Sequence, residues 1–289
     1  ENLNVSNTNS ASFDVFQDSS GITNLTNVVR DSSEYITSIV PAGFTNNNST
    51  LSVNLRQLYP LDNALTDILG NQNLVNSPDG SGSNITFNSS TKKLGTHSAY
   101  FDGNQYTEFG FDNGSGGEGV PYFHTNNSNG SYPPSALSIA YWAYWTPDNN
   151  DWNMILDGYH GSTASKRNYI FTIGNDNSGN SAHDKPAVWD GLDENWGSAQ
   201  DGGAESNASA VSHNTWVHIV QTLTSTKKQN FINGSLSGSA HTGTYGFGSN
   251  GTGAHARIGG RRDNSSYQFK GYLDQFAIWD RELTATDAS

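Results

Sequence analysis

The fold is decided by Phe269-Lys270-Gly271-Tyr272-Leu273-Asp274-Gln275-Phe276-Ala277-Ile278-Trp279-Asp280-Arg281-Glu282-Leu283. This stretch predicts a turn at Gly271 and then a strand over Tyr272–Trp279, in which the run Phe276–Trp279 is apolar at every position. A strand that is apolar on both faces is typical of the centre of a sheet that is covered on both sides. Asp274 lies inside this strand, and a charge in that position is costly unless it is paired or binds a cation.

The composition favours an all-β protein. The 289 residues are 33% hydrophobic and 14% charged, with 31 glycines, and the abundant Asn, Ser, Thr and Gly favour turns and strands over helix interiors. The net charge of −13 argues against nucleic-acid binding, which needs a basic face, and disfavours anionic membrane surfaces. There is no Cys, so disulfides contribute nothing to stability. No apolar run reaches the length of a membrane span.

Further candidate strands precede the closing stretch, and the longest is Leu137–Trp145. The alternate residues on one of its faces are Leu137, Ile139, Tyr141, Ala143 and Trp145. A long polar loop is expected over about residues 174–210, followed by a strand at Trp216–Val220. Asn233-Gly234 predicts a hairpin, because Asn-Gly readily supplies the positive φ angles of a type I′ turn.

Residues 1–55 are set apart by their polarity. Their short apolar patches, such as Phe13–Phe16 and Ile39-Val40, are too few for an independent core. We expect residues 1–55 to form an arm or small subdomain that packs on the main domain or on a neighbouring subunit. Residues 56–289 are expected to form the main domain.

Several motifs, in the expected order, resemble laminin G-like (LamG) domains of the concanavalin A-like lectin/glucanase superfamily, to which the pentraxins also belong. Besides the closing stretch, these are the Asp and Gly-Asn of Asp67–Asn73, the aromatic-Asp-Gly turn of Tyr100–Tyr106, and the Asn233-Gly234 hairpin. The resemblance covers about residues 57–287 and implies a two-sheet antiparallel jelly-roll sandwich. The strand pattern favours the same architecture.

A shorter resemblance concerns location. The segment Asp14–Ile22 looks like spacers that precede LamG modules in large virion proteins of marine bacteriophages. This implies an extracellular or virion-surface protein that contacts other virion or assembly subunits through its N-terminal arm.

The sequence does not predict an enzyme. Retaining glucanases of the superfamily place carboxylates at alternate positions of one strand, so that they project to one face. No strand here has that pattern, and the Arg, Gln-x-His and Tyr set of the superfamily's lyases is also missing. The nearest acidic group, Asp190–Glu194, is interpreted as a solvated loop. A glycoside hydrolase or polysaccharide lyase stays an alternative.

Calcium is the one inorganic partner that the sequence supports, because hard cations bind carboxylate and carbonyl oxygens, which Asp- and Asn-rich loops supply. By resemblance to LamG and pentraxin domains, the candidate ligands are Asp67 and Asp274, and then Asp102 and Asn104. The alternative is that Asp102 caps its own turn and Asp274 pairs with an arginine such as Arg257.

Glycan binding is the family's commonest use, and pyranose rings stack their C–H faces on exposed aromatic rings. The tryptophans in polar, Gly-rich surroundings are placed in loops, outside the predicted strands. The candidate glycan-binding residues are Trp152, Trp189, Trp196, Tyr159, Asp190 and Asp193. Each loop tryptophan could equally close the end of the sandwich.

The sequence therefore predicts a non-catalytic surface protein that binds polysaccharide or surface glycans on a virion (as a decoration, fibre or tail component) or in an extracellular assembly. A purely structural protein without a glycan ligand is the alternative.

Overall fold

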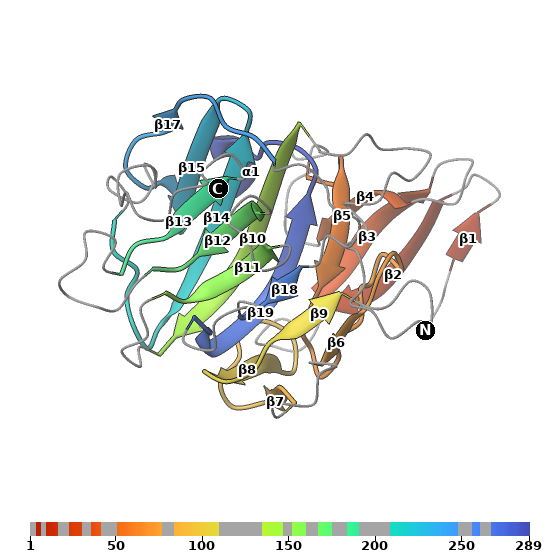
Figure 1. Cartoon of the computed structure of the whole chain (residues 1–289). Coiled ribbons are helices and arrows are strands. Elements are labelled where there is room, and N and C mark those ends of the chain that lie inside the picture. Colours follow the sequence, from red (N-terminus) through yellow and green to blue (C-terminus); the bar gives the residue numbers. More distant parts are fainter. Residues whose placement is uncertain are drawn as a thin grey trace, which may run out of the picture.

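The structure is a computed structural model that describes residues 51–76, 84–109, 135–146, 152–159, 167–174, 184–190, 209–247, 256–260 and 267–289, together with four strands nearer the N-terminus. Most of these residues belong to two antiparallel sheets that face each other (Figure 1). The only helix in the described part of the chain is the four-residue α1 (Ala285–Ala288). No described helix has the length and apolar character that a membrane span needs.

The first sheet has nine strands. Its main order is β16-β15-β14-β10-β19-β8-β7, with β17 paired to β15 and β5 paired to β19. The strands are β5 (Leu55–Tyr59), β7 (Thr86–Asn88), β8 (Ser98–Asp102), β10 (Ala136–Trp145), β14 (Trp216–Thr224), β15 (Lys227–Ile232), β16 (Ser235–Leu236), β17 (His241–Thr242) and β19 (Lys270–Trp279).

The second sheet has six strands in the order β13-β12-β11-β18-β9-β6. They are β6 (Leu74–Asn76), β9 (Thr107–Phe109), β11 (Met154–Tyr159), β12 (Arg167–Thr172), β13 (Ala187–Asp190) and β18 (Arg257–Ile258). Two antiparallel sheets with almost no helix are consistent with a jelly-roll sandwich, so the predicted fold class is confirmed.

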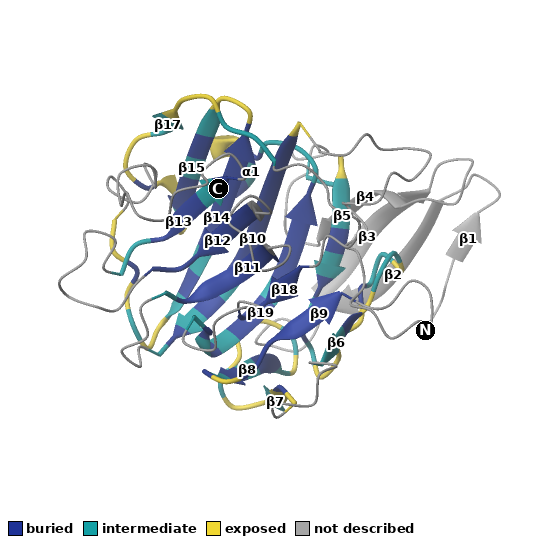
Figure 2. Cartoon of the chain, in the orientation of Figure 1, coloured by how far each residue is buried: buried dark blue, intermediate teal, exposed yellow. Residues whose placement is uncertain are grey.

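The core lies between the two sheets. The alternate residues of β10 that were expected on one face, from Leu137 to Trp145, are all buried in one hydrophobic cluster. From the six-stranded sheet, Leu156, Phe171 and Val188 join the same cluster. Figure 2 shows this buried centre surrounded by partly exposed strand ends and turns.

The closing strand β19 is central, as the sequence predicted, because it lies between β10 on one side and β5 and β8 on the other. The predicted turn at Gly271 is wrong. Gly271 lies within β19, in register with Trp145 and Phe101. Its φ of +139° and its close approach to the Tyr144 carbonyl oxygen explain the glycine, since a Cβ would lie 2.2 Å from that oxygen.

We expect Gly271→Ala to destabilise the fold by about 2–3 kcal/mol more than Gly70→Ala, because overpacking against backbone adds to the strain of a positive φ. Gly70 is the matched control, since its φ is +76° but nothing lies within 4 Å of an added Cβ. Urea denaturation of the two variants measures the difference. Equal midpoints would contradict the steric account.

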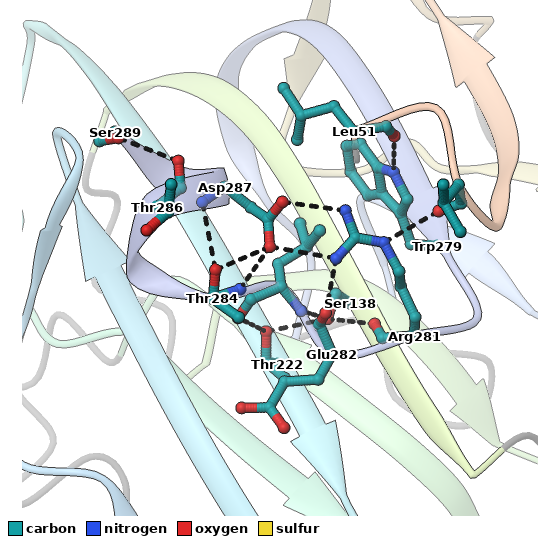
Figure 3. Close-up of polar contacts among 12 residues, drawn as sticks. Leu51, Ser138, Thr222, Trp279, Arg281, Glu282, Thr284, Thr286, Asp287 and Ser289 are labelled. Carbon is teal, nitrogen blue, oxygen red and sulfur yellow. Dashed lines mark hydrogen bonds and ion pairs between the residues drawn. The ribbon is translucent and has the colours of Figure 1, made fainter. Parts of the chain in front are cut away.

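One end of the outer face of the nine-stranded sheet is covered by the last residues of the chain, which we call the C-terminal clasp (residues 281–289; Figure 3). Arg281 makes a bidentate ion pair with Asp287, at 3.0 Å for both contacts, and donates from Nε to the Val53 carbonyl oxygen at 2.9 Å. Trp279 Nε1 donates to the Leu51 carbonyl oxygen at 2.6 Å. At this end, β19 is covered on both sides.

The N-terminal segment contains a separate four-stranded antiparallel sheet in the order β1-β2-β3-β4. Its strands are β1 (Asn4–Ser6), β2 (Ser10–Phe16), β3 (Thr23–Arg30) and β4 (Ile36–Pro41). The division between residues 55 and 56 stays a prediction. Leu51 packs on the same cluster as Trp279, which ties the residues just before β5 to the sandwich.

Candidate functional site

The first calcium candidate, Asp67, holds the loop after β5. Its buried Oδ1 accepts hydrogen bonds from the amides of Leu58 and Leu69, and its Oδ2 accepts from the amides of Asn71 and Gln72, all at 3.0–3.1 Å. Burial raises the pKa of Asp67, while these amides act in the opposite direction. Four N–H donors surround the carboxylate, so its oxygens are committed to backbone rather than to a cation.

The second candidate, Asp274, is also fully buried and accepts hydrogen bonds at Oδ2 from the amides of Lys93 (2.9 Å) and Leu94 (3.0 Å). Burial raises its pKa to about 7, although the backbone N–H groups oppose the shift. The suggested pairing of Asp274 with Arg257 is wrong, because Arg257 pairs with Glu108 at 2.6 Å.

The third candidate, Asp102, accepts a hydrogen bond from the Asn104 amide at 2.8 Å, which is the turn-capping role offered as its alternative. Within the described ranges, no three His, Asp or Glu side chains come close enough together to hold a metal ion. Calcium binding therefore stays a prediction.

Two of the predicted glycan-binding residues come together. The rings of Trp152 and Trp189 pack edge to face, with centroids 5.5 Å apart and planes at 85°, and both residues are partly exposed. The prediction that Trp189 lies in a loop is wrong, since it belongs to β13, the edge strand of the six-stranded sheet. The two rings thus form a partly exposed aromatic pair at the β13 edge of the six-stranded sheet, as far as the structure describes it.

Asp190 points the other way, into the sandwich. The residue is 3% exposed, its Oδ1 lies 2.8 Å from the Nζ of the fully buried Lys228, and its Oδ2 accepts a hydrogen bond from the Gly246 amide at 3.0 Å. The Lys228 ammonium also lies 4.3 Å from the ring centroid of Tyr245. The interpretation of Asp190 as part of a solvated, sugar-binding loop is therefore wrong, because strand alternation turns it inward when Trp189 faces outward.

The other predicted glycan residues are not placed. Trp196 and Asp193 lie outside the described residues. Tyr159 is the last residue of β11, and the structure does not describe its side chain.

A transverse row of residues crosses all six strands of the second sheet. In register from edge to edge it contains Trp189, Ile170, Asp157, Arg257, Glu108 and Val75. Residues directly opposite on paired strands point to the same face. The neighbouring row, with Val188, Phe171 and Leu156, lies in the core, so this outer row faces away from the core.

The middle of the outer row is charged and buried. Glu108 and Arg257 form the ion pair described above, Arg257 lies 3.9 Å from the ring centroid of Tyr106, and Asp157 is the next residue along. The sequence analysis missed this group because its members come from three distant segments. The sequence signal that could have pointed to this group is an acidic residue next to a short apolar run, as Asp157 follows Met154–Leu156.

The Trp152–Trp189 pair offers aromatic surface that can receive the C–H face of a sugar. The charged residues in register with Trp189 are buried, so the partly exposed ring pair supplies the surface that a ligand can reach. The two row carboxylates come from different strands, and the guanidinium of Arg257 stands between them in the register.

Comparisons with known proteins agree with this architecture. A family model described as the concanavalin A-like lectin/glucanases superfamily matches residues 115–289. Domain 4 of AbnA, an extracellular GH43 arabinanase from Geobacillus stearothermophilus in complex with arabinotriose, has a similar fold, with a TM-score of 0.54 and 17% identity over 81% of this chain and 96% of that domain. No curated protein matches the sequence.

Weaker similarities extend to parts of larger proteins. The binding domain of paraclostridial mosquitocidal protein 1 gives a TM-score of 0.49 at 14% identity, over 82% of this chain and 51% of that one. A Trypanosoma rangeli sialidase mutant gives 0.47 at 10% identity, and the chain, matched over 82% of its length, spans only 32% of that enzyme. The family model covers more than half of the residues, and the sandwich agrees with it: the chain belongs to the concanavalin A-like lectin/glucanase superfamily.

Proposed function

We propose that this protein is a non-catalytic surface protein that binds glycans, on a virion or in an extracellular assembly. The observation that carries the proposal is the partly exposed Trp152–Trp189 pair at the edge of the six-stranded sheet. Aromatic side chains with an apolar face and a polar edge suit ligands that are apolar on one side and hydroxylated on the other.

The same row argues for binding without cleavage. Glycoside hydrolysis needs one carboxylic acid that donates a proton and a second carboxylate that acts as nucleophile or base. Glu108 is held in a buried ion pair with Arg257, so its carboxylate is engaged by the guanidinium. A hydrolase stays the alternative, because Glu108 and Asp157 flank Arg257 on one face.

Location and assembly belong to the same proposal. The resemblance of Asp14–Ile22 to phage spacer segments supports a decoration, fibre or tail component. The four-stranded N-terminal sheet would supply the contact to other virion or assembly subunits. A structural protein without a glycan ligand would share this sheet, so only binding measurements separate the two roles.

A glycan array followed by titration calorimetry tests the proposal, with arabino-oligosaccharides included because the AbnA domain was studied with arabinotriose. We expect Trp189→Ala and Trp152→Ala each to weaken binding roughly tenfold or more, as loss of a central aromatic contact does. Val75→Ala, at the opposite end of the outer row, is the control and should change affinity little.

The melting midpoint of each variant shows whether the fold is intact. Silence of the wild type across the array would favour the purely structural role. Release of reducing sugar from a bound glycan, lost in Glu108→Gln, would favour the hydrolase.

A further inference from the structure

The outer face of the nine-stranded sheet carries a second group of aromatic residues, at the end that the C-terminal clasp does not cover. Trp216, Tyr144, Tyr272 and Tyr100 lie in register across β14, β10, β19 and β8, and we call them the aromatic row. Their chain neighbours Val217, Ala143, Leu273 and Ala99 belong to the core. The aromatic row therefore faces away from the core.

The four rings form a continuous contact series. Tyr144 packs edge to face on Trp216, with centroids 5.8 Å apart, and on Tyr272 at 5.7 Å, while Tyr272 and Tyr100 are tilted at 4.8 Å. All four residues are partly exposed. At the clasp end of the same face, Ala277 and Trp279 are instead covered by Leu51, Leu283 and Ala288.

A second line of side chains runs beside the aromatic row. Trp142 packs against His218 at 5.0 Å, and the Lys93 ammonium lies 4.1 Å from the Trp142 ring centroid. Leu94, which follows Lys93, is 39% exposed and so extends the apolar surface. An aromatic and apolar area of this kind on a sheet face is a feature of binding surfaces more than of inert ones.

Three lysines gather around the aromatic row, although the chain carries a net charge of −13. Lys92 and Lys93 are exposed, and Lys270 is partly exposed on the same face of β19 as Tyr272. Three carboxylates lie near these lysines: Asp102, opposite Lys270 in register, Asp62, which accepts from the amides of Thr96 and His97, and Asp274, buried beneath the Lys93 amide. Burial, and then Lys93, lower the pKa of His218 to about 4, so the ammonium groups supply the positive charge at neutral pH.

We propose that the aromatic row and its flanking lysines form a second glycan site, which binds an acidic polysaccharide such as one built from uronate or sulfated sugars. The rings contact the C–H faces of the sugar units, and the lysines bind the carboxylate or sulfate groups. The site lies on the opposite sheet from the Trp152–Trp189 pair and does not depend on it.

Charge also argues against a second copy of the chain as the occupant. A two-fold contact pairs a surface with itself, so the lysines of both copies would meet one another. A role limited to stabilising the sheet would explain the ring contacts between neighbouring strands. It would not explain why lysines gather beside these partly exposed rings.

The test uses the full chain on sensors that carry polygalacturonate, alginate or ι-carrageenan, with methyl-esterified polygalacturonate as the matched uncharged polymer. We expect binding to at least one acidic polymer. Polygalacturonate, where it binds, should bind at least tenfold more tightly than its ester, and affinity should fall as salt rises. Trp216→Ala and Tyr272→Ala should each weaken binding roughly tenfold, and the exposed Lys93→Gln by roughly threefold to tenfold.

Trp189→Ala should leave this binding unchanged, which separates the second site from the first. The proposal is overturned if no acidic polymer binds, if the ester binds equally well, or if Lys93→Gln and both aromatic variants bind as the wild type does. Light scattering that shows a dimer which Tyr272→Ala dissociates would also overturn it, in favour of self-association.

Discussion

Lys228→Met should destabilise the protein by about 3–5 kcal/mol, since it leaves the buried Asp190 carboxylate without its cation. Lys228 is fully buried and its Nζ lies 2.8 Å from Asp190 Oδ1. Methionine keeps an unbranched apolar stem in this space but removes the ammonium and its cation–π contact with Tyr245, so the loss would report mainly on charge. Urea denaturation at neutral pH measures the change.

The neighbouring lysine is the control. Lys227 pairs with Glu282 on the surface, where both side chains are about one-third exposed, and Lys227→Met should cost less than about 1 kcal/mol. The double variant Lys228→Met, Asp190→Asn should recover most of the stability, because neither buried charge remains. Equal midpoints for the two lysine variants would mean that the Asp190 pair contributes no more than a surface pair.

Asp274→Asn should stabilise the protein at pH 8 by up to about 4 kcal/mol and have little effect near pH 4. The folded pKa of Asp274 is about 7, above its ordinary value of 3.8. Between these values the folded state keeps a proton that the unfolded state has released, so wild-type stability falls as pH rises from about 4 to 7 and then levels off. Asparagine cannot ionise and removes this loss.

The measurement is the free energy of unfolding of the wild type and of Asp274→Asn at pH 4 and pH 8, with Asp102→Asn as the control at a partly exposed turn. A difference between wild type and Asp274→Asn that is the same at both pH values would contradict the account. Repeating the series with calcium also tests the predicted metal role, since a cation at Asp274 would stabilise the wild type at pH 8 and not the variant.

The sequence was sufficient for the fold because strand alternation and turn chemistry are local. The face of β10 from Leu137 to Trp145 and the central place of β19 were both predicted from residue order alone. The prediction that β19 is covered on both sides holds for its Trp279 end. At Tyr272 the outer neighbours are half-exposed rings, and alternation cannot tell which segment, if any, covers a face.

The candidate site was harder to predict because it depends on non-local register. Once Ala187–Asp190 is a strand, Trp189 and Asp190 must point to opposite faces, but its four residues inside a polar stretch gave too weak a signal. The partners of Asp190 and Arg257, which are Lys228 and Glu108, are distant in sequence. Only the strand pairing brings them together.

The position of β19 has a consequence for folding kinetics. This strand is the last one of the described chain, yet it lies at the centre of the nine-stranded sheet, where Tyr59 of β5 pairs with Phe276. Chains dominated by such long-range pairings fold slowly, because the entropy of closing long loops must be lost before the contacts form. During synthesis, the pairing edges of β8 and β10 that β19 occupies would stay open until β19 had left the ribosome, and unpaired strand edges favour aggregation.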